Sequence, residues 1–258
     1  MLINEKTALS SSRVLLVPYS KHHVPRYHEW MKDPEIQQAT ASEPLSLSEE
    51  YAMQTSWRTD ADKLTFIVCL PVHDTLSQSP TSILTDPSID APAAMLGDVN
   101  MFLRVDEEDE GEDGGNGASD SIVVGEIELM IAEKAKQGRG FGRAALICFL
   151  KYISEHESEI VSGFVGSTLT TSSTGSVAGV GRSTGGKAQN LAYLSAKIGA
   201  DNVRSLALFE SVGFKTVSEG PNVFGEVELR RESLRGDEGR ELLGKWEVEG
   251  YREIGYER

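Results

Sequence analysis

The apolar residues of this chain gather in short runs, and the spacing within each run predicts a strand or a helix. Runs rich in β-branched and aromatic residues predict strands at residues 13–17, 63–70, 95–105, 122–132 and 192–198, and a closing hairpin at 214–217 and 223–229. Helical spacing and capping signals predict helices at residues 22–31, 46–57, 140–155 and 202–212. Strands and helices therefore alternate, which indicates a mixed α/β (α+β) fold.

Local signals define several of these elements more closely. Ser46 followed by Glu49 is typical of a capping box, so we expect a helix that begins there and ends near Trp57. Asn202 can cap the last helix and Gly213 can stop it. Because residues 106–120 join two adjacent strands, we expect an antiparallel hairpin with a long tip.

Three segments have the composition of disordered insertions. Residues 106–120 carry eight acidic residues and no basic one, residues 71–94 are rich in proline, and residues 162–190 are mostly Gly, Ser and Thr. Without them, residues 11–231 form one domain of ordinary size. The tail 232–258 is charged, and Leu242, Leu243, Trp246 and Tyr251 are spaced roughly as one helix face. That face can pack back on the domain or bind a partner.

Charge and cysteine usage exclude several classes of protein. The chain has 25 basic and 40 acidic residues, a net charge of −15, which argues against nucleic acid as the main partner. No run of about 18 apolar residues occurs, so we expect no membrane span. Cys69 and Cys148 lie in apolar runs, which predicts buried free thiols in a reducing compartment such as the cytoplasm. The histidines show no metal-ligand spacing with carboxylates, so no metal is expected.

Residues 137–143 read Gln-Gly-Arg-Gly-Phe-Gly-Arg, between a predicted strand and a predicted helix. Glycines allow a tight turn and close approach of a ligand to the backbone, and the unpaired N–H groups that open a helix bind pyrophosphate. A P-loop needs Gly-Lys-Ser/Thr at its end, and a dinucleotide fingerprint needs a glycine where Arg143 stands. The sequence matches neither motif, which leaves an ordinary glycine-rich loop or another cofactor motif.

The motif Q/R-x-x-G-x-G/A fits this loop, through Gln137, Gly140 and Gly142. It resembles the acetyl-coenzyme A signature of the GNAT superfamily of N-acetyltransferases. The strand before it and the segment 202–214 resemble that superfamily's fourth strand and second cofactor motif. The resemblance implies a single GNAT-like domain, whose central, mostly antiparallel mixed sheet is flanked by helices. It also implies acetyl-CoA as co-substrate.

Five shorter strings narrow the resemblance. Residues 23–31, 40–44, 50–54, 97–100 and 196–199 are similar to the N-acetyltransferase 9 family, which is associated with acetylating the amino termini of α- and β-tubulin. This implies transfer to the α-amine of a protein, with tubulin or microtubules as partner. Acetylation of lysine or a small amine, or a non-catalytic acetyl-CoA-binding scaffold, are the alternatives.

The resemblance also implies which residues hold the cofactor. Backbone N–H groups of the loop should ring the pyrophosphate, and the end of the preceding strand should offer its backbone to the pantetheine amides. Asn202 and Ser205 can contact pantetheine or cap their helix. Phe209 stands where many relatives have a tyrosine that donates to the leaving thiolate. The complete expected set is Met130, Ile131, Ala132, Gln137, Gly138, Arg139, Gly140, Phe141, Gly142, Arg143, Asn202, Ser205 and Phe209.

The superfamily transfers acetyl directly, so the remaining task is to neutralise the amine. Glu126 and Glu128 lie two apart on one strand and project from one face, and either can act as a base through a water molecule. The alternative is that both face solvent as partners of positive side chains. At pH 7 the neutral form costs about 1 kcal/mol for an α-amine and about 4–5 kcal/mol for a lysine. A weakly equipped site therefore favours the α-amine.

Overall fold

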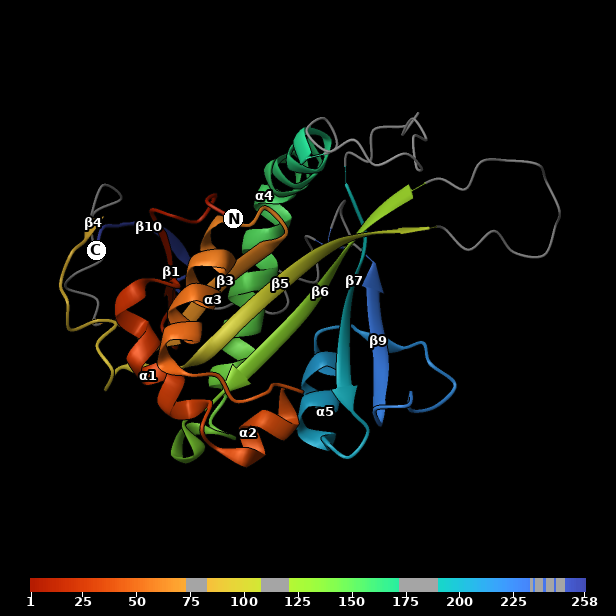
Figure 1. The fold of residues 1–258 in the computed structure, drawn as a ribbon, viewed down its shortest axis with the longest axis horizontal. Helices are drawn as coiled ribbons and strands as arrows, with labels where there is room; N and C mark the ends of the chain where they lie inside the picture. Colours follow the sequence, from red (N-terminus) through yellow and green to blue (C-terminus); the bar gives the residue numbers. More distant parts are fainter. Residues whose placement is uncertain are drawn as a thin grey trace, which may run out of the picture.

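The fold is described from a computed structural model, which defines residues 1–72, 83–107, 121–171, 190–232 and 249–258, and single positions 234, 239 and 244. A ten-stranded sheet, in the order β4-β10-β1-β2-β3-β5-β6-β7-β9-β8, runs through this part of the chain (Figure 1). The strands are β1 Thr7–Ser10, β2 Leu15–Pro18, β3 Lys63–Cys69, β4 Ile83–Leu84, β5 Met95–Glu107, β6 Ser121–Ile131, β7 Leu191–Gly199, β8 Lys215–Thr216, β9 Glu226–Glu232 and β10 Arg252–Tyr256. The helices are η1 Lys21–His23, α1 Val24–Trp30, α2 Pro34–Ala39, α3 Leu47–Thr59, η3 Lys134–Lys136, α4 Phe141–Thr171 and α5 Val203–Ser211.

The sheet is mixed and mostly antiparallel, as expected. β5 and β6 form the predicted antiparallel hairpin, in a register that places Gly97 opposite Ile131 and Asn100 opposite Glu128. The parallel pairs are β6 with β7, which α4 connects, and β10 with β4. The point where the β6–β7 pairing ends shapes the candidate site described below.

Helices cover both faces of the sheet, so its central strands are buried on both sides. On one face α4 packs its apolar stripe against the strands, and Phe66 of β3 meets the rings of Phe149 and Tyr152. On the other face, α1 and α3 cover Ile67, the next residue of β3. Successive side chains of a strand point to opposite faces, and both faces are covered, which explains why β3 is buried from Leu64 to Cys69. None of the helices in the described residues is long and apolar enough to cross a membrane.

Several predicted boundaries were wrong. α4 continues to Thr171, well into the segment 162–190 that we expected to be an insertion, because glycine and serine weaken a helix without preventing it. Residues 83–84 of the expected insertion 71–94 form β4, and Ile89 and Asp90 are buried. Residues 106–107 belong to β5. The rest of these three segments, 73–82, 108–120 and 172–189, lies outside the described residues.

The sheet also extends past both ends of the expected domain 11–231. β1 and β10 pair with each other, with Ala8 opposite Ile254, so the end of the expected tail is a strand of the same sheet. Leu242, Leu243 and Trp246 of the expected helix face lie outside the described residues. Tyr251 directly precedes β10 and is not helical, and it packs against the core, which agrees with a tail that packs back on the domain. β1, β4 and β10 were missed because they are short, and β4 and β10 pair only with strands that are distant in sequence.

Candidate active site

The loop after β6 folds back on the end of its own strand. The N–H groups of Ala132 and Glu133 donate to the carbonyl of Leu96, at 2.8 and 3.2 Å, and the side-chain amide of Gln137 donates to the carbonyl of Ile131 at 2.8 Å. Gln137 thus closes the loop instead of pointing away from it. Hydrogen bonds from Arg26 and Trp30 of α1 to Glu133 anchor the same junction, which gives the string 23–31 a structural role.

Two glycines give the loop its shape. Gly138 and Gly140 have φ of 68° and 85°, a left-handed conformation that a side chain disfavours. Gly142 lies inside α4, and a Cβ there would meet Ile131 and Leu129 at ordinary contact distance. The structure therefore explains why the motif requires glycine at 140 and accepts alanine at 142.

The loop delivers a helix N-terminus to an exposed surface. The carbonyl of Gly140 accepts from the N–H of Ala144 at 3.0 Å, so α4 begins there and its first N–H groups, from Phe141 to Arg143, have no acceptor within the helix. The positive end of the helix dipole adds to this site for an anion. Arg13 donates to the carbonyl of Arg139 at 3.4 Å and brings a further positive charge to the loop. Arg13 is distant in sequence, and no pattern pointed to it.

β6 and β7 separate beside this loop. The two strands pair from Val123 to Glu126, and Glu126 lies opposite Ser195, although β6 continues to Ile131 and β7 to Gly199. Figure 1 shows the strands close together at one end and apart at the other. On the side of β7, the last five residues of β6, which include Met130, therefore have no strand partner in the described part of the chain. Ala132 follows directly and is buried.

The second cofactor motif begins α5, which lies beside the same gap. Asn202 accepts a hydrogen bond from the N–H of Ser205 at 3.2 Å, so it caps the helix, one of the two roles considered for it. Ser205 is half-buried. Phe209 is buried and packs edge-on against Phe214, with ring centroids 5.1 Å apart. Its ring belongs to the core, which accounts for an apolar residue at this position.

The structure distinguishes the two candidate bases. Glu126 accepts from Lys197 at 2.8 Å and from Arg104 at 3.2 Å through the same oxygen, so cations from β7 and β5 hold its charge. Glu128 makes no hydrogen bond or ion pair with any residue that the structure describes. Its side chain is exposed, but the surrounding protein removes part of its hydration and, with the charges of Asp98 and Glu126, raises its pKa to about 7.

Tyr193 and the two cysteines carry reactive groups that the reaction does not use. Tyr193 pairs with Val124, at the other end of β6 from the loop, and its hydroxyl donates to Asp106, so it does not reach the gap. Both cysteines are buried free thiols, as predicted, and burial raises the pKa of Cys148 to about 12. A nucleophilic cysteine needs an accessible thiolate, which neither position offers.

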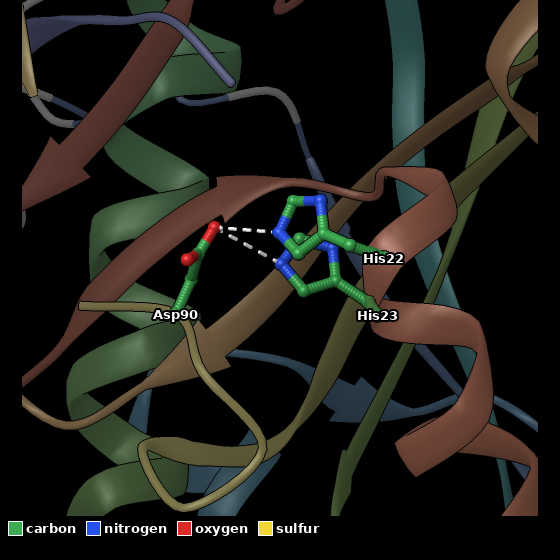
Figure 2. Close-up of side chains that lie close together, drawn as sticks. All are labelled: His22, His23 and Asp90. Carbon is green, nitrogen blue, oxygen red and sulfur yellow. Dashed lines mark hydrogen bonds and ion pairs between the residues drawn. The ribbon is translucent and has the colours of Figure 1, made fainter. Parts of the chain in front are cut away.

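His22, His23 and Asp90 form a compact group that the sequence spacing did not reveal (Figure 2). Nε2 of His22 and of His23 lie 2.8 and 3.3 Å from one oxygen of Asp90, and the hydroxyl of Tyr256 donates to the same oxygen at 2.5 Å. Nδ1 of His23 accepts from the N–H of Ser20 at 3.0 Å, which places the ring proton on Nε2. With that proton donated to Asp90, Nε2 has no lone pair for a metal, and the group is better suited to join η1 to β10.

Comparison with known proteins agrees with this geometry. The family described as acetyltransferase (GNAT) domain matches residues 13–215. The chain is 38% identical over 231 residues to Alpha/beta-tubulin-N-acetyltransferase 9 of Homo sapiens, across 89% of this chain and 85% of the human protein. It is 37% identical over 240 residues to an N-acetyltransferase 9-like protein of Schizosaccharomyces pombe, across 89% of this chain and 97% of that protein.

Among solved structures, the chain is similar to an acetyltransferase of the GNAT family from Bacillus anthracis. The TM-score is 0.50 at 11% identity, over 88% of this chain and 99% of that one, which supports the fold alone. The matched family covers the loop, the separated strands and the second cofactor motif together. The chain therefore belongs to the GNAT acetyltransferases, in the group of the N-acetyltransferase 9 proteins, and is an acetyl-CoA-dependent N-acetyltransferase.

Proposed function

We propose that this enzyme acetylates the α-amine at the amino terminus of a protein, and that tubulin is its substrate. The tubulin part rests on relatives whose names state that substrate, at 38% identity in Homo sapiens and 36% in Drosophila melanogaster. The observation that carries the α-amine part is Glu128, a carboxylate without a cationic partner among the described residues, next to the point where β6 leaves β7.

The cofactor has a defined place in this proposal. The N–H groups at the start of α4 and the charge of Arg13 would hold the pyrophosphate, and the free backbone edge of β6, from Ile127 to Ile131, would bind the pantetheine amides. Acetyl-CoA supplies the activated thioester. A pantetheine group extended along β6 from the loop would run toward Glu126, where β6 and β7 join, and would pass Glu128.

Glu128 is the proposed general base. It accepts one proton from the ammonium form of the substrate, through a water molecule, and the neutral nitrogen then attacks the thioester carbonyl. The new C–N bond forms, the C–S bond breaks, and CoA leaves as the thiolate. No acyl-enzyme is needed, in agreement with the buried thiols of Cys69 and Cys148.

The proton affinities of base and substrate match. A pKa of about 7 for Glu128 is close to the 7.7–8.0 of a typical α-amine, so transfer between them costs about 1 kcal/mol. Transfer from a lysine, with a pKa of about 10.4, costs about 3–4 kcal/mol more. This base therefore favours an α-amine by a large factor.

We expect the enzyme to acetylate a peptide with a free amino terminus at least about tenfold faster than the same peptide blocked there and carrying one internal lysine. Mass spectrometry with labelled acetyl-CoA would locate the acetyl group. A tubulin amino-terminal peptide and a scrambled version of it separate the tubulin assignment from the α-amine assignment. Equal or faster turnover of the blocked peptide would contradict the proposal. No label on either peptide would favour the alternative of a non-catalytic scaffold that binds acetyl-CoA.

The loop's role gives a second expected result. Gly140→Asp introduces a side chain at a positive φ and a negative charge at the anion site, so calorimetry should show acetyl-CoA affinity at least about tenfold weaker. Gly142→Ala is the matched control, because its added methyl has ordinary space and should leave affinity nearly unchanged. A folded Gly140→Asp protein with normal affinity would show that the cofactor binds elsewhere.

We also propose that the protein acts in the cytoplasm. Its two cysteines are free and buried, which suits a reducing compartment, and tubulin as a substrate would place it there. Neither nucleic acid nor a membrane is part of the proposed activity.

A further inference from the structure

Asp98 is a fully buried carboxylate on the strand next to Glu128. In the β5–β6 register Asp98 lies opposite Met130, and Asn100 lies opposite Glu128. Side chains of directly opposed residues project from the same face, so Asp98 is the diagonal neighbour of Glu128. Tyr27 of α1 covers this face at Asp98, while Glu128 is exposed. Asp98 belongs to the string 97–100, which resembles the N-acetyltransferase 9 family.

The partners of Asp98 are neutral. One carboxylate oxygen accepts from the side-chain amide of Asn100 at 2.7 Å and from the hydroxyl of Tyr27 at 3.4 Å. No cation bonds to it among the residues that the structure describes. Burial raises the pKa of Asp98 to about 6, although both hydrogen bonds oppose the increase. A buried carboxylate held this way is costly for stability, which points to a functional reason for its presence.

The surroundings of Glu128 are predominantly negative. The groups that face it from the packed elements are Asp98 of β5, Glu126 of β6, Lys197 of β7, Glu226 of β9 and Tyr27 of α1. Tyr19, which precedes η1, and Glu50 of α3 contribute to the raised pKa of Tyr27. Lys197 is the single cation in this set, and its ammonium group is bound to Glu126. Asp98 is thus the buried charge that most directly opposes ionisation of Glu128.

We propose that Asp98 is a positioning residue for the base: held by Tyr27 and Asn100, its charge makes Glu128 bind the proton that leaves the substrate amine. Asp98 is buried and Glu128 is exposed on the adjacent strand, and two neighbouring carboxylates repel each other when both are ionised. The pair therefore takes up one proton readily near neutral pH and the second only in more acid solution. This inference rests on the proposed role of Glu128 and extends it to a residue that does not touch the substrate.

The test uses Asp98→Asn, which keeps the shape of the side chain and removes its charge. Carbon NMR of carboxyl-labelled glutamate should show the titration midpoint of Glu128 lower by about one pH unit in the variant. Glu228→Gln is the matched control, because it removes a carboxylate of β9 that is bound to Arg230, and it should leave the midpoint unchanged.

The ratio of variant to wild-type kcat/KM provides the kinetic readout, because deprotonation of the substrate cancels in it. A midpoint lower by one unit makes this ratio about fivefold larger at pH 6 than at pH 8.5. A midpoint of Glu128 that does not move in the folded variant would overturn the role of Asp98, whether or not the enzyme prefers an α-amine.

Two further results keep the test decisive. If Asp98→Asn does not fold, the wild-type protein with aspartate and glutamate both carboxyl-labelled decides: the Asp98 and Glu128 signals should titrate together in two steps, and independent single-step curves would contradict the inference. If the Glu128 midpoint shifts as expected but neither peptide is acetylated, the coupling stands and the proposed function fails.

Discussion

Glu128→Gln is expected to reduce kcat for an α-amine peptide by about 10²-fold or more, while acetyl-CoA binding stays near the wild-type value. Glutamine keeps the shape of the side chain but cannot accept the proton of the amine. Single-turnover kinetics with labelled acetyl-CoA would measure the chemical step, and calorimetry would measure cofactor affinity. Activity of the wild-type enzyme should rise with pH through about 7, where Glu128 loses its proton, and this limb should be altered in the variant.

Glu126→Gln is the matched control for this experiment. It removes a carboxylate from the same strand and face, but one whose charge Lys197 and Arg104 already hold. We expect a much smaller loss of kcat. A loss equal to that of Glu128→Gln would mean that the ion-paired residue, or the pair together, provides the base.

Although Glu128→Gln should lower activity, it should not lower stability. The folded-state pKa of Glu128 is raised to about 7, so between pH 4.5 and 7 the folded state binds more protons than the unfolded state, and stability falls as pH rises through this range. Glu128→Gln removes that loss. Its melting temperature at pH 8 should therefore match or exceed that of the wild type, which would also show that the lost activity is not unfolding.

Asp90→Ala is expected to lower the free energy of unfolding by about 3–5 kcal/mol, the usual cost of removing one partner of a buried charged group. Asp90 is fully buried and joins η1 to Tyr256 of β10, and the guanidinium of Arg258 lies 3.2 Å from its other oxygen. Burial alone would raise the pKa of Asp90, but the hydrogen bonds from the two histidines and Tyr256 outweigh it and lower the pKa well below its usual range. Its contribution to stability is therefore present above about pH 4 and is lost as the pH falls further.

Urea unfolding of Asp90→Ala beside Asp86→Ala would measure this effect. Asp86 is exposed in the same segment and accepts from the N–H of Ser88, so its loss should cost about 1 kcal/mol or less. Chelator should leave the wild-type melting temperature unchanged, because the proton on Nε2 of His23 already fills the position of a metal. Stabilisation of the wild type by added zinc, or equal stability of the two variants, would contradict the role of Asp90 as a metal-free link between η1 and β10.

Elements with strong local signals were predicted closely. β3 was expected at 63–70 and spans 63–69, and the capping box at Ser46 begins α3, with the Glu49 N–H donating back to the serine hydroxyl. The tight turn at 137–143 was predicted from its glycines, because a positive φ, as at Gly138 and Gly140, is a conformation that glycine adopts without a steric penalty. These features depend on residues within about one turn or one strand of each other.

Features that depend on distant residues could not be predicted in this way. β10 is short and charged, and it becomes a strand only because β1 and β4 offer it partners from residues about 170 or more positions away. Arg13 reaches the cofactor loop across 126 residues. The group around Asp90 joins residues 22–23 to a segment whose composition is typical of a disordered insertion.

The sequence alone was enough to predict the family, a glycine loop before a helix, a strand with two glutamates and two buried thiols. It could not separate Glu126 from Glu128, because both have the same residue type, strand and face. Tertiary structure gives the two carboxylates different surroundings: Arg104 and Lys197 approach Glu126 from neighbouring strands, while Glu128 lies beyond the point where β7 departs and beside buried Asp98. The proton affinity of a carboxylate depends on the charges and the water within a few ångströms, and those are set by strand register.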